Sequence, residues 1–66
     1  MPSTKQIVAF KIGARARKMA GEDCIVEGYE ILDAAIRTAQ AQGDEELESL
    51  LREELRKYEH RYLPQP

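Results

Sequence analysis

The stretch ILDAAIRTAQAQGDEELESLLREEL, residues 31–55, decides the fold of this 66-residue chain. Apolar residues recur every three to four positions on both sides of Gly43, which is the spacing of one face of an α-helix. Gly43 stops a helix, and Asp44 is a favourable N-cap for a helix with acids in its first turn. The stretch therefore predicts two antiparallel helices, over residues 24–42 and 45–62.

These two helices carry complementary apolar faces. The first sets small residues among larger ones and the second carries leucines and tyrosines, a large-against-small pattern typical of a packed seam. Val26, Ile31 and Leu50 lie off that seam, so one hairpin cannot cover them all. We expect a second copy to cover them in a homodimeric helical bundle, rather than the first segment of the same chain. The residues expected at this association interface are Ile25, Leu32, Ile36, Leu47, Leu51, Leu55 and Tyr58.

The amino-terminal segment is compatible with two structures. Residues 5–12, KQIVAFKI, alternate like a strand and are rich in β-branched side chains, but they also place Val8 and Ile12 on one helical face. Alanines further along the segment, and a capping box between Ser3 and Gln6, favour a third helix over residues 4–20.

The ends of the elements follow from local signals. Gly21 is expected to be the C-cap of the first helix and Asp23 the N-cap of the second. Pro64 cannot continue the last helix, because it lacks an N–H. We therefore expect one all-α domain over residues 1–66, with residues 1–3 and 63–66 as extended or disordered tails.

The length of the chain limits its stability. A chain of this size buries only about 60% of the surface that it exposes when unfolded, and such small folds usually need further support. Cys24 is the only cysteine, so the chain contains no internal disulfide. Association or tight helix packing is the expected support.

The composition also indicates a location. The amino terminus has no apolar segment or cleavage site typical of a secretory signal, and no apolar run approaches the ~20 residues that span a bilayer. A single unpaired cysteine suits a reducing compartment. We expect a cytoplasmic protein without a membrane partner.

Few residues could carry chemistry. His60 is the only histidine, and neither it nor Cys24 has the converging partners that catalysis or metal binding needs. The acids from Glu22 to Asp33 are best interpreted as a solvated face, because no histidine follows at the spacing of di-iron bundles. The sequence therefore predicts no enzyme, no cofactor and no metal site.

Charge is distributed unevenly along the chain. Residues 1–21 hold five cations and no acid, a net charge of +5, whereas residues 22–66 hold twelve acids and five cations, a net charge of −7. The candidate binding residues in the basic segment, Lys5–Lys18, are Lys11, Arg15, Arg17 and Lys18.

Two functions compete for this basic segment, and a third interpretation is a solvated face that binds nothing. We favour a non-catalytic protein association module, whose partner is a second copy of the chain or an acidic protein surface. The alternative is a small nucleic-acid-binding regulator, since phosphate neutralisation needs clustered Lys and Arg. Against it, the whole chain has a net charge of −2 and no aromatic platform accompanies the cations.

Overall fold

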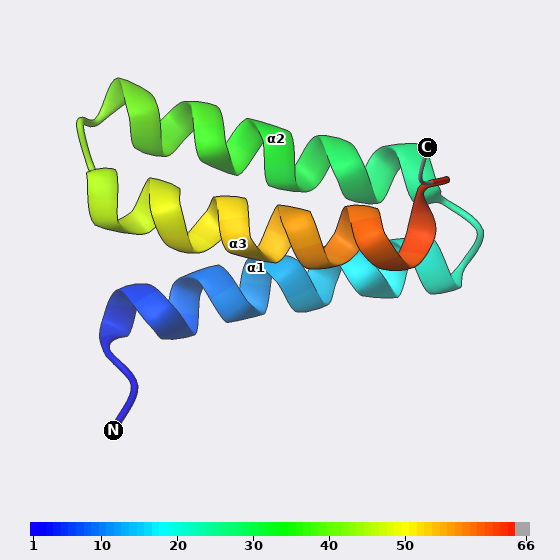
Figure 1. The fold of residues 1–66 in the computed structure, drawn as a ribbon, viewed down its shortest axis with the longest axis horizontal. Helices are drawn as coiled ribbons and strands as arrows, with labels where there is room; N and C mark the ends of the chain where they lie inside the picture. Colours follow the sequence, from blue (N-terminus) through cyan, green and yellow to red (C-terminus); the bar gives the residue numbers. More distant parts are fainter. Residues whose placement is uncertain (65–66) are drawn as a thin grey trace.

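The structure is a computed structural model that describes residues 1–64. It contains three α-helices, α1 (Thr4–Gly21), α2 (Ile25–Ala41) and α3 (Glu45–Tyr62). Each helix runs antiparallel to the one before it, and each contacts the other two (Figure 1). No strand is present among the described residues. The predicted all-α fold is confirmed, including a helix rather than a strand at the amino terminus.

Two of the three helices begin at the predicted caps. At the start of α1, the Ser3 hydroxyl accepts from the Gln6 N–H at 3.2 Å, and the Gln6 side chain accepts from the Ser3 N–H at 2.7 Å. At the start of α3, the Asp44 carboxylate accepts from the Leu47 N–H at 3.1 Å. These bonds satisfy N–H groups that have no partner inside the helix.

The two turns between helices share one backbone motif. After α2, Gly43 is left-handed (φ 69°), and the Asp44 N–H donates to the Ala39 carbonyl at 2.9 Å. After α1, Asp23 is left-handed (φ 67°), and the Cys24 N–H donates to the Met19 carbonyl at 2.9 Å. Both are Schellman motifs, in which glycine is the usual left-handed residue.

The predicted caps at the first turn are wrong. Glu22, rather than Gly21, is the C-cap of α1, and the residue before α2 is Cys24, whose side chain forms no capping hydrogen bond. Asp23 is occupied as the left-handed residue of the turn, so its carboxylate does not cap α2. Asp tolerates this conformation better than most residues with a side chain.

The described tails agree with the local signals. Residues 1–3 precede α1, and Leu63 is extended (φ −107°, ψ 145°), as expected for a residue before proline. Residues 65–66 of the predicted carboxy-terminal tail lie outside the described residues.

The fully buried residues of α1 are all small. Ala9, Gly13, Ala16 and Ala20 recur at intervals of four, three and four residues, and all are buried. The large side chains come from the other two helices, with Leu32 and Ile36 on α2 and Leu51 and Tyr58 on α3. α1 adds Ile12, which is partly buried against both core clusters, and the small residues of α1 let its backbone approach the α2–α3 hairpin closely.

Tyr58 joins the three helices at one level of the bundle. Its hydroxyl donates to the Ile25 carbonyl at 2.5 Å, and burial raises the pKa of its phenol. Gly28 makes room for this ring: a Cβ atom there would overlap the Tyr58 hydroxyl and lie 2.6 Å from the Ala16 carbonyl oxygen. Gly28 is therefore required where α1, α2 and α3 meet.

An ion pair joins the other end of α1 to α3. The Lys5 ammonium lies 2.9 Å from the Asp44 carboxylate, and this hydrogen bond is the largest cause that lowers the pKa of Asp44 and raises that of Lys5. Asp44 thus serves both as the cap of α3 and as the partner of α1.

Two of the three apolar residues that were expected to lie off the hairpin seam are partly covered within the single chain. Ile31 and Leu50, expected to lie off the seam, are half-buried against the core, whereas Val26 remains 64% exposed. The single chain therefore meets much of the need for burial that motivated a dimer, and the dimer itself remains a prediction. Within residues 1–64, no helix has both the length and the apolar character that crossing a membrane requires.

We predict that Gly28→Ala destabilises the fold by about 1–3 kcal/mol, because the added methyl group overpacks a contact that includes backbone. Urea unfolding followed by circular dichroism measures the change. Gly21→Ala is the matched control: apart from its chain neighbours and the backbone of its own helix, nothing lies within 4 Å of the added Cβ, so it should be neutral or gain up to about 1 kcal/mol. Equal stabilities for the two variants would contradict the close packing described at Gly28.

Candidate functional site

A groove runs along the surface between α1 and α3. Its larger part has a volume of about 590 Å³, and a second hollow of about 510 Å³ shares Phe10, Glu54 and Lys57 with it, so the two form one feature, the α1–α3 groove. One end is apolar and the other is basic. The apolar end is lined by Pro2, Ile7, Phe10 and Leu50, and the basic end by Arg17, Lys57, His60 and Arg61.

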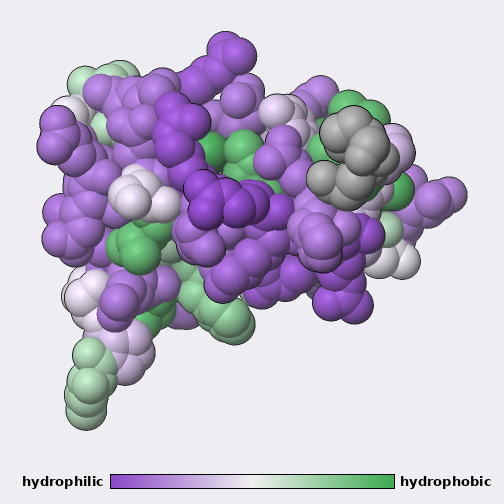
Figure 2. Space-filling model, viewed as in Figure 1, coloured by the Kyte–Doolittle hydropathy of each residue, from purple (hydrophilic) through white to green (hydrophobic). Residues whose placement is uncertain are grey.

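The apolar end is exposed to solvent. Phe10 is 60% exposed and Ile7 is 41% exposed, although they lie on a helix whose buried face is only a few residues away. Green patches interrupt the hydrophilic surface over the amino-terminal half of α1 (Figure 2). Helix geometry explains the exposure: Ala9 and Gly13 point into the core, so Phe10 lies at the margin of that face, toward α3, and Ile7 lies still further out.

A buried carboxylate forms the floor of the groove. Glu54 is only 7% exposed, and its two oxygens lie 3.1 Å from Nη1 of Arg17 and 3.3 Å from Nζ of Lys57. Gly13 leaves the space for this carboxylate, since a Cβ atom at that position would overlap Oε1. The Glu54–Arg17 pair therefore joins α1 to α3 where a larger residue would separate them.

Arg17 also contacts the aromatic ring at the centre of the groove. Its guanidinium carbon lies 5.5 Å from the centroid of the Phe10 ring, in the range of a cation–π interaction. Arg17 thus holds Glu54 on one side and Phe10 on the other. Arg17 therefore has two partners within the chain and links the buried carboxylate to the aromatic ring.

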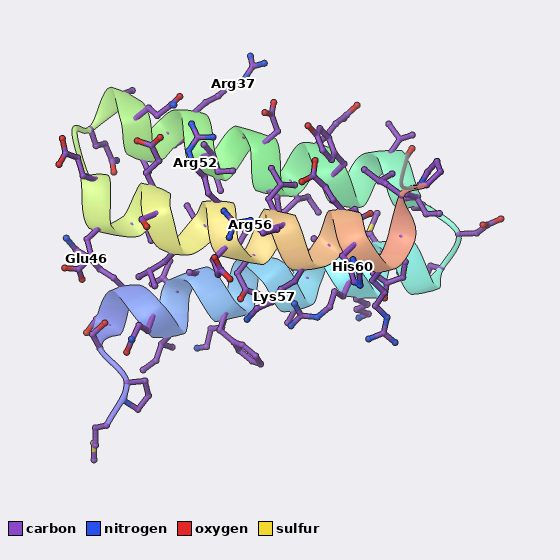
Figure 3. All side chains as sticks on the ribbon, in the orientation of Figure 1. Arg37, Glu46, Arg52, Arg56, Lys57 and His60 are labelled. Carbon is purple, nitrogen blue, oxygen red and sulfur yellow. The ribbon has the colours of Figure 1, made fainter. Side chains whose placement is uncertain are left out.

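The basic end carries excess positive charge. Lys57 and His60 project from α3 beside α1, as the labelled side chains in Figure 3 show. Arg61 contacts the Tyr62 ring at 5.5 Å and forms no ion pair with any residue of the described range 1–64. Glu53, the other acid in the groove wall, lies 3.0 Å from Arg56 and is already paired.

The structure separates the four candidate cations of the basic segment. Lys11, Arg15 and Lys18 are exposed on the face of α1 opposite its small residues, and none is ion-paired within residues 1–64. Arg17 lies toward α3, half-buried against Glu54. Lys11 alone belongs both to the outward stripe of three cations and to the wall of the groove.

The seven predicted association residues are gathered inside the single chain. Leu32, Ile36, Leu51 and Tyr58 are at most 4% exposed, and the other three pack against the same two core clusters: Ile25, Leu47 and Leu55. Their apolar surface is therefore largely occupied by contacts among the three helices.

Sequence reasoning missed Ile7 and Phe10 as surface candidates. It considered Val8, Ile12 and Met19 as the apolar face of the first helix; Ile12 does pack against both core clusters, whereas Val8 is 39% exposed. The spacing of Ala9, Gly13, Ala16 and Ala20 is the signal that identifies the buried face, and it leaves Phe10 outside.

The other reactive side chains do not converge. Cys24 is half-buried, and its thiol lies 3.6 Å from the backbone carbonyl of Glu22. Among residues 1–64, His, Cys, Asp and Glu side chains do not gather in any group of three that could hold a metal ion. Comparison of the chain with protein-family models, with curated proteins and with solved structures finds no match.

We predict a strong energetic coupling between Arg17 and Glu54. Arg17→Met leaves a buried carboxylate with Lys57 as its only partner and should cost about 1–3 kcal/mol, whereas Arg17→Met with Glu54→Met should restore much of that loss, because no buried charge remains. A four-variant cycle measured by urea unfolding gives the coupling energy.

The exposed pair of Glu53 and Arg56 is the matched control for this cycle. Their side chains are 54% and 75% exposed, so their coupling should be no more than about 0.5 kcal/mol. A coupling at Arg17–Glu54 as small as that of the control would contradict the role of this pair in holding α1 to α3.

Proposed function

We propose that this chain is a non-catalytic module for association with protein, and that the α1–α3 groove is its contact surface. The observation that carries the proposal is the exposure of Phe10, a large apolar side chain at the centre of a groove that charged residues surround. Exposed apolar patches with a polar rim are typical of protein-binding sites.

The chemistry of the groove favours binding over catalysis. Side-chain catalysis needs an acid, a base or a nucleophile that converges on a reacting atom. His60 lines the groove, but both oxygens of Glu54 are held by cations, Glu53 is paired with Arg56, and Cys24 lies outside the lining. The groove therefore suits recognition of a partner better than catalysis.

The partner can be tested without knowing its identity. We predict that p-benzoylphenylalanine in place of Phe10 forms a light-dependent protein adduct in an extract of the cells that make the chain. The same group in place of Val26 is the matched control, because Val26 is 64% exposed on α2 and does not line the groove. Adducts of equal yield at the two positions, or none at position 10, would refute the groove as the contact surface.

The mass of the adduct separates the kinds of protein partner. Cross-linking of the purified 7.5 kDa chain to a product of twice its mass would support the predicted homodimer. A product of another mass, seen only with extract, would support a different protein.

A second candidate function rests on a separate observation. Lys11, Arg15 and Lys18 form an exposed stripe without ion pairs among residues 1–64, which suits contact with nucleic-acid phosphates. Phosphate binding does not account for the groove, because the apolar end of the groove contributes nothing to it. We therefore rank it second.

Under this second candidate function, the chain should bind labelled duplex DNA. The affinity of the chain for the DNA should fall about 40-fold between 50 and 200 mM salt if three phosphates are neutralised. Reversal of Lys11, Arg15 and Lys18 to Glu should abolish binding. Reversal of Arg37, Arg52 and Arg56 (Figure 3) makes the same change in net charge on α2 and α3 and is the control. Absence of binding at 50 mM salt would dismiss the second candidate.

A further inference from the structure

We infer that the occupant of the α1–α3 groove is an acidic amphipathic helix of a partner protein. This inference rests on the proposed function and adds the shape and charge of the partner.

The geometry of the groove suits a helix. Its walls come from two helices that lie side by side (Figure 1), so a helix placed between them would complete a four-helix arrangement. Along α1, the groove extends from Gln6 to Arg17, which corresponds to about 17 Å at the helical rise. That length accepts about three turns of a partner helix, whose apolar residues at i, i+3 or i+4, and i+7 would meet Ile7, Phe10 and Leu50.

The charges of the groove favour a partner helix whose polar face is acidic. The walls hold four Lys or Arg residues and two Glu residues, a net charge of +2, on a chain whose net charge is −2. Both glutamates are already ion-paired within the chain. Lys11 and Arg61 have no ion pair within residues 1–64 and lie in different parts of the groove. Carboxylates on both sides of an apolar centre would complement them.

The same charges disfavour a second copy as the occupant. In a two-fold dimer, each contact surface meets an identical one. Two α1–α3 grooves pressed together would bring Lys11 and Arg61 of both copies, which have no ion pair within residues 1–64, into one low-dielectric contact. A different chain with acidic residues avoids this repulsion.

A selection of peptides from a random library tests the inference directly. The bait is the intact 66-residue chain, and the library displays random 18-residue peptides. Peptides enriched on the chain should be net negative, with apolar residues at helical spacing, and should become helical when bound. Enrichment of neutral or basic peptides, or of none, would overturn the inference.

Variants of the chain assign the binding to the groove. Phe10→Ser should lower the affinity of the enriched peptides about tenfold or more, because the central apolar anchor is lost. Lys11→Glu with Arg61→Glu should remove the preference for acidic peptides and leave the Glu54 ion pairs intact. Val26→Ser is the control and should bind like the wild type.

Circular dichroism confirms that each variant is folded, and Phe10→Leu should retain partial binding if serine unfolds the chain. Binding that Phe10→Ser and Phe10→Leu leave unchanged would overturn the inference.

Failure of the inference can be distinguished from failure of the proposed function. If the adduct at position 10 maps to a second copy or to a non-acidic segment, the inference is wrong and the association function stands. If no adduct forms at position 10, the association function fails with it.

Discussion

The close approach of α1 to the α2–α3 hairpin is the constraint on which the rest of the structure depends. Ala9, Gly13, Ala16 and Ala20 remove side-chain bulk from the buried face of α1, so the core volume must come from Leu32, Leu51 and Tyr58 on the other helices. A chain of 66 residues has little apolar surface to bury, and packing backbone against large side chains uses that surface well. The small face thereby supplies the support that no disulfide provides within this chain.

The same small face accounts for the groove. Because alanine and glycine occupy the buried positions of α1, its larger side chains lie at the margin of the core, and Phe10 is 60% exposed there. Gly13 admits the carboxylate of Glu54, which in turn holds Arg17 beside the Phe10 ring. Stability and surface chemistry are thus linked through one helix: the residues that let α1 approach the hairpin also determine what it exposes.

Several features of the fold follow from the sequence because they depend on residues close together in the chain. The period of the apolar residues, the capping box of Ser3 and Gln6, and the Gly43-Asp44 turn predict three helices whose ends agree with the structure to within one residue. At the first turn the prediction of the caps was wrong, since Asp23 takes a left-handed conformation that glycine usually adopts. Local preferences rank such alternatives weakly, and the packing of the helices decides between them.

The sequence by itself determined the helical class, the positions of the three helices and the separation of basic and acidic segments, because each is a property of neighbouring residues. Only the tertiary structure decided which face of α1 is buried and that this face packs against the hairpin. It also decided that Arg17, unlike the other candidate cations, pairs with Glu54, and that Ile7 and Phe10 border a groove. The physical reason is distance along the chain: Arg17 and Glu54 are 37 residues apart, and Tyr58 and Ile25 are 33 apart. Contacts of this kind form only when the helices pack against one another.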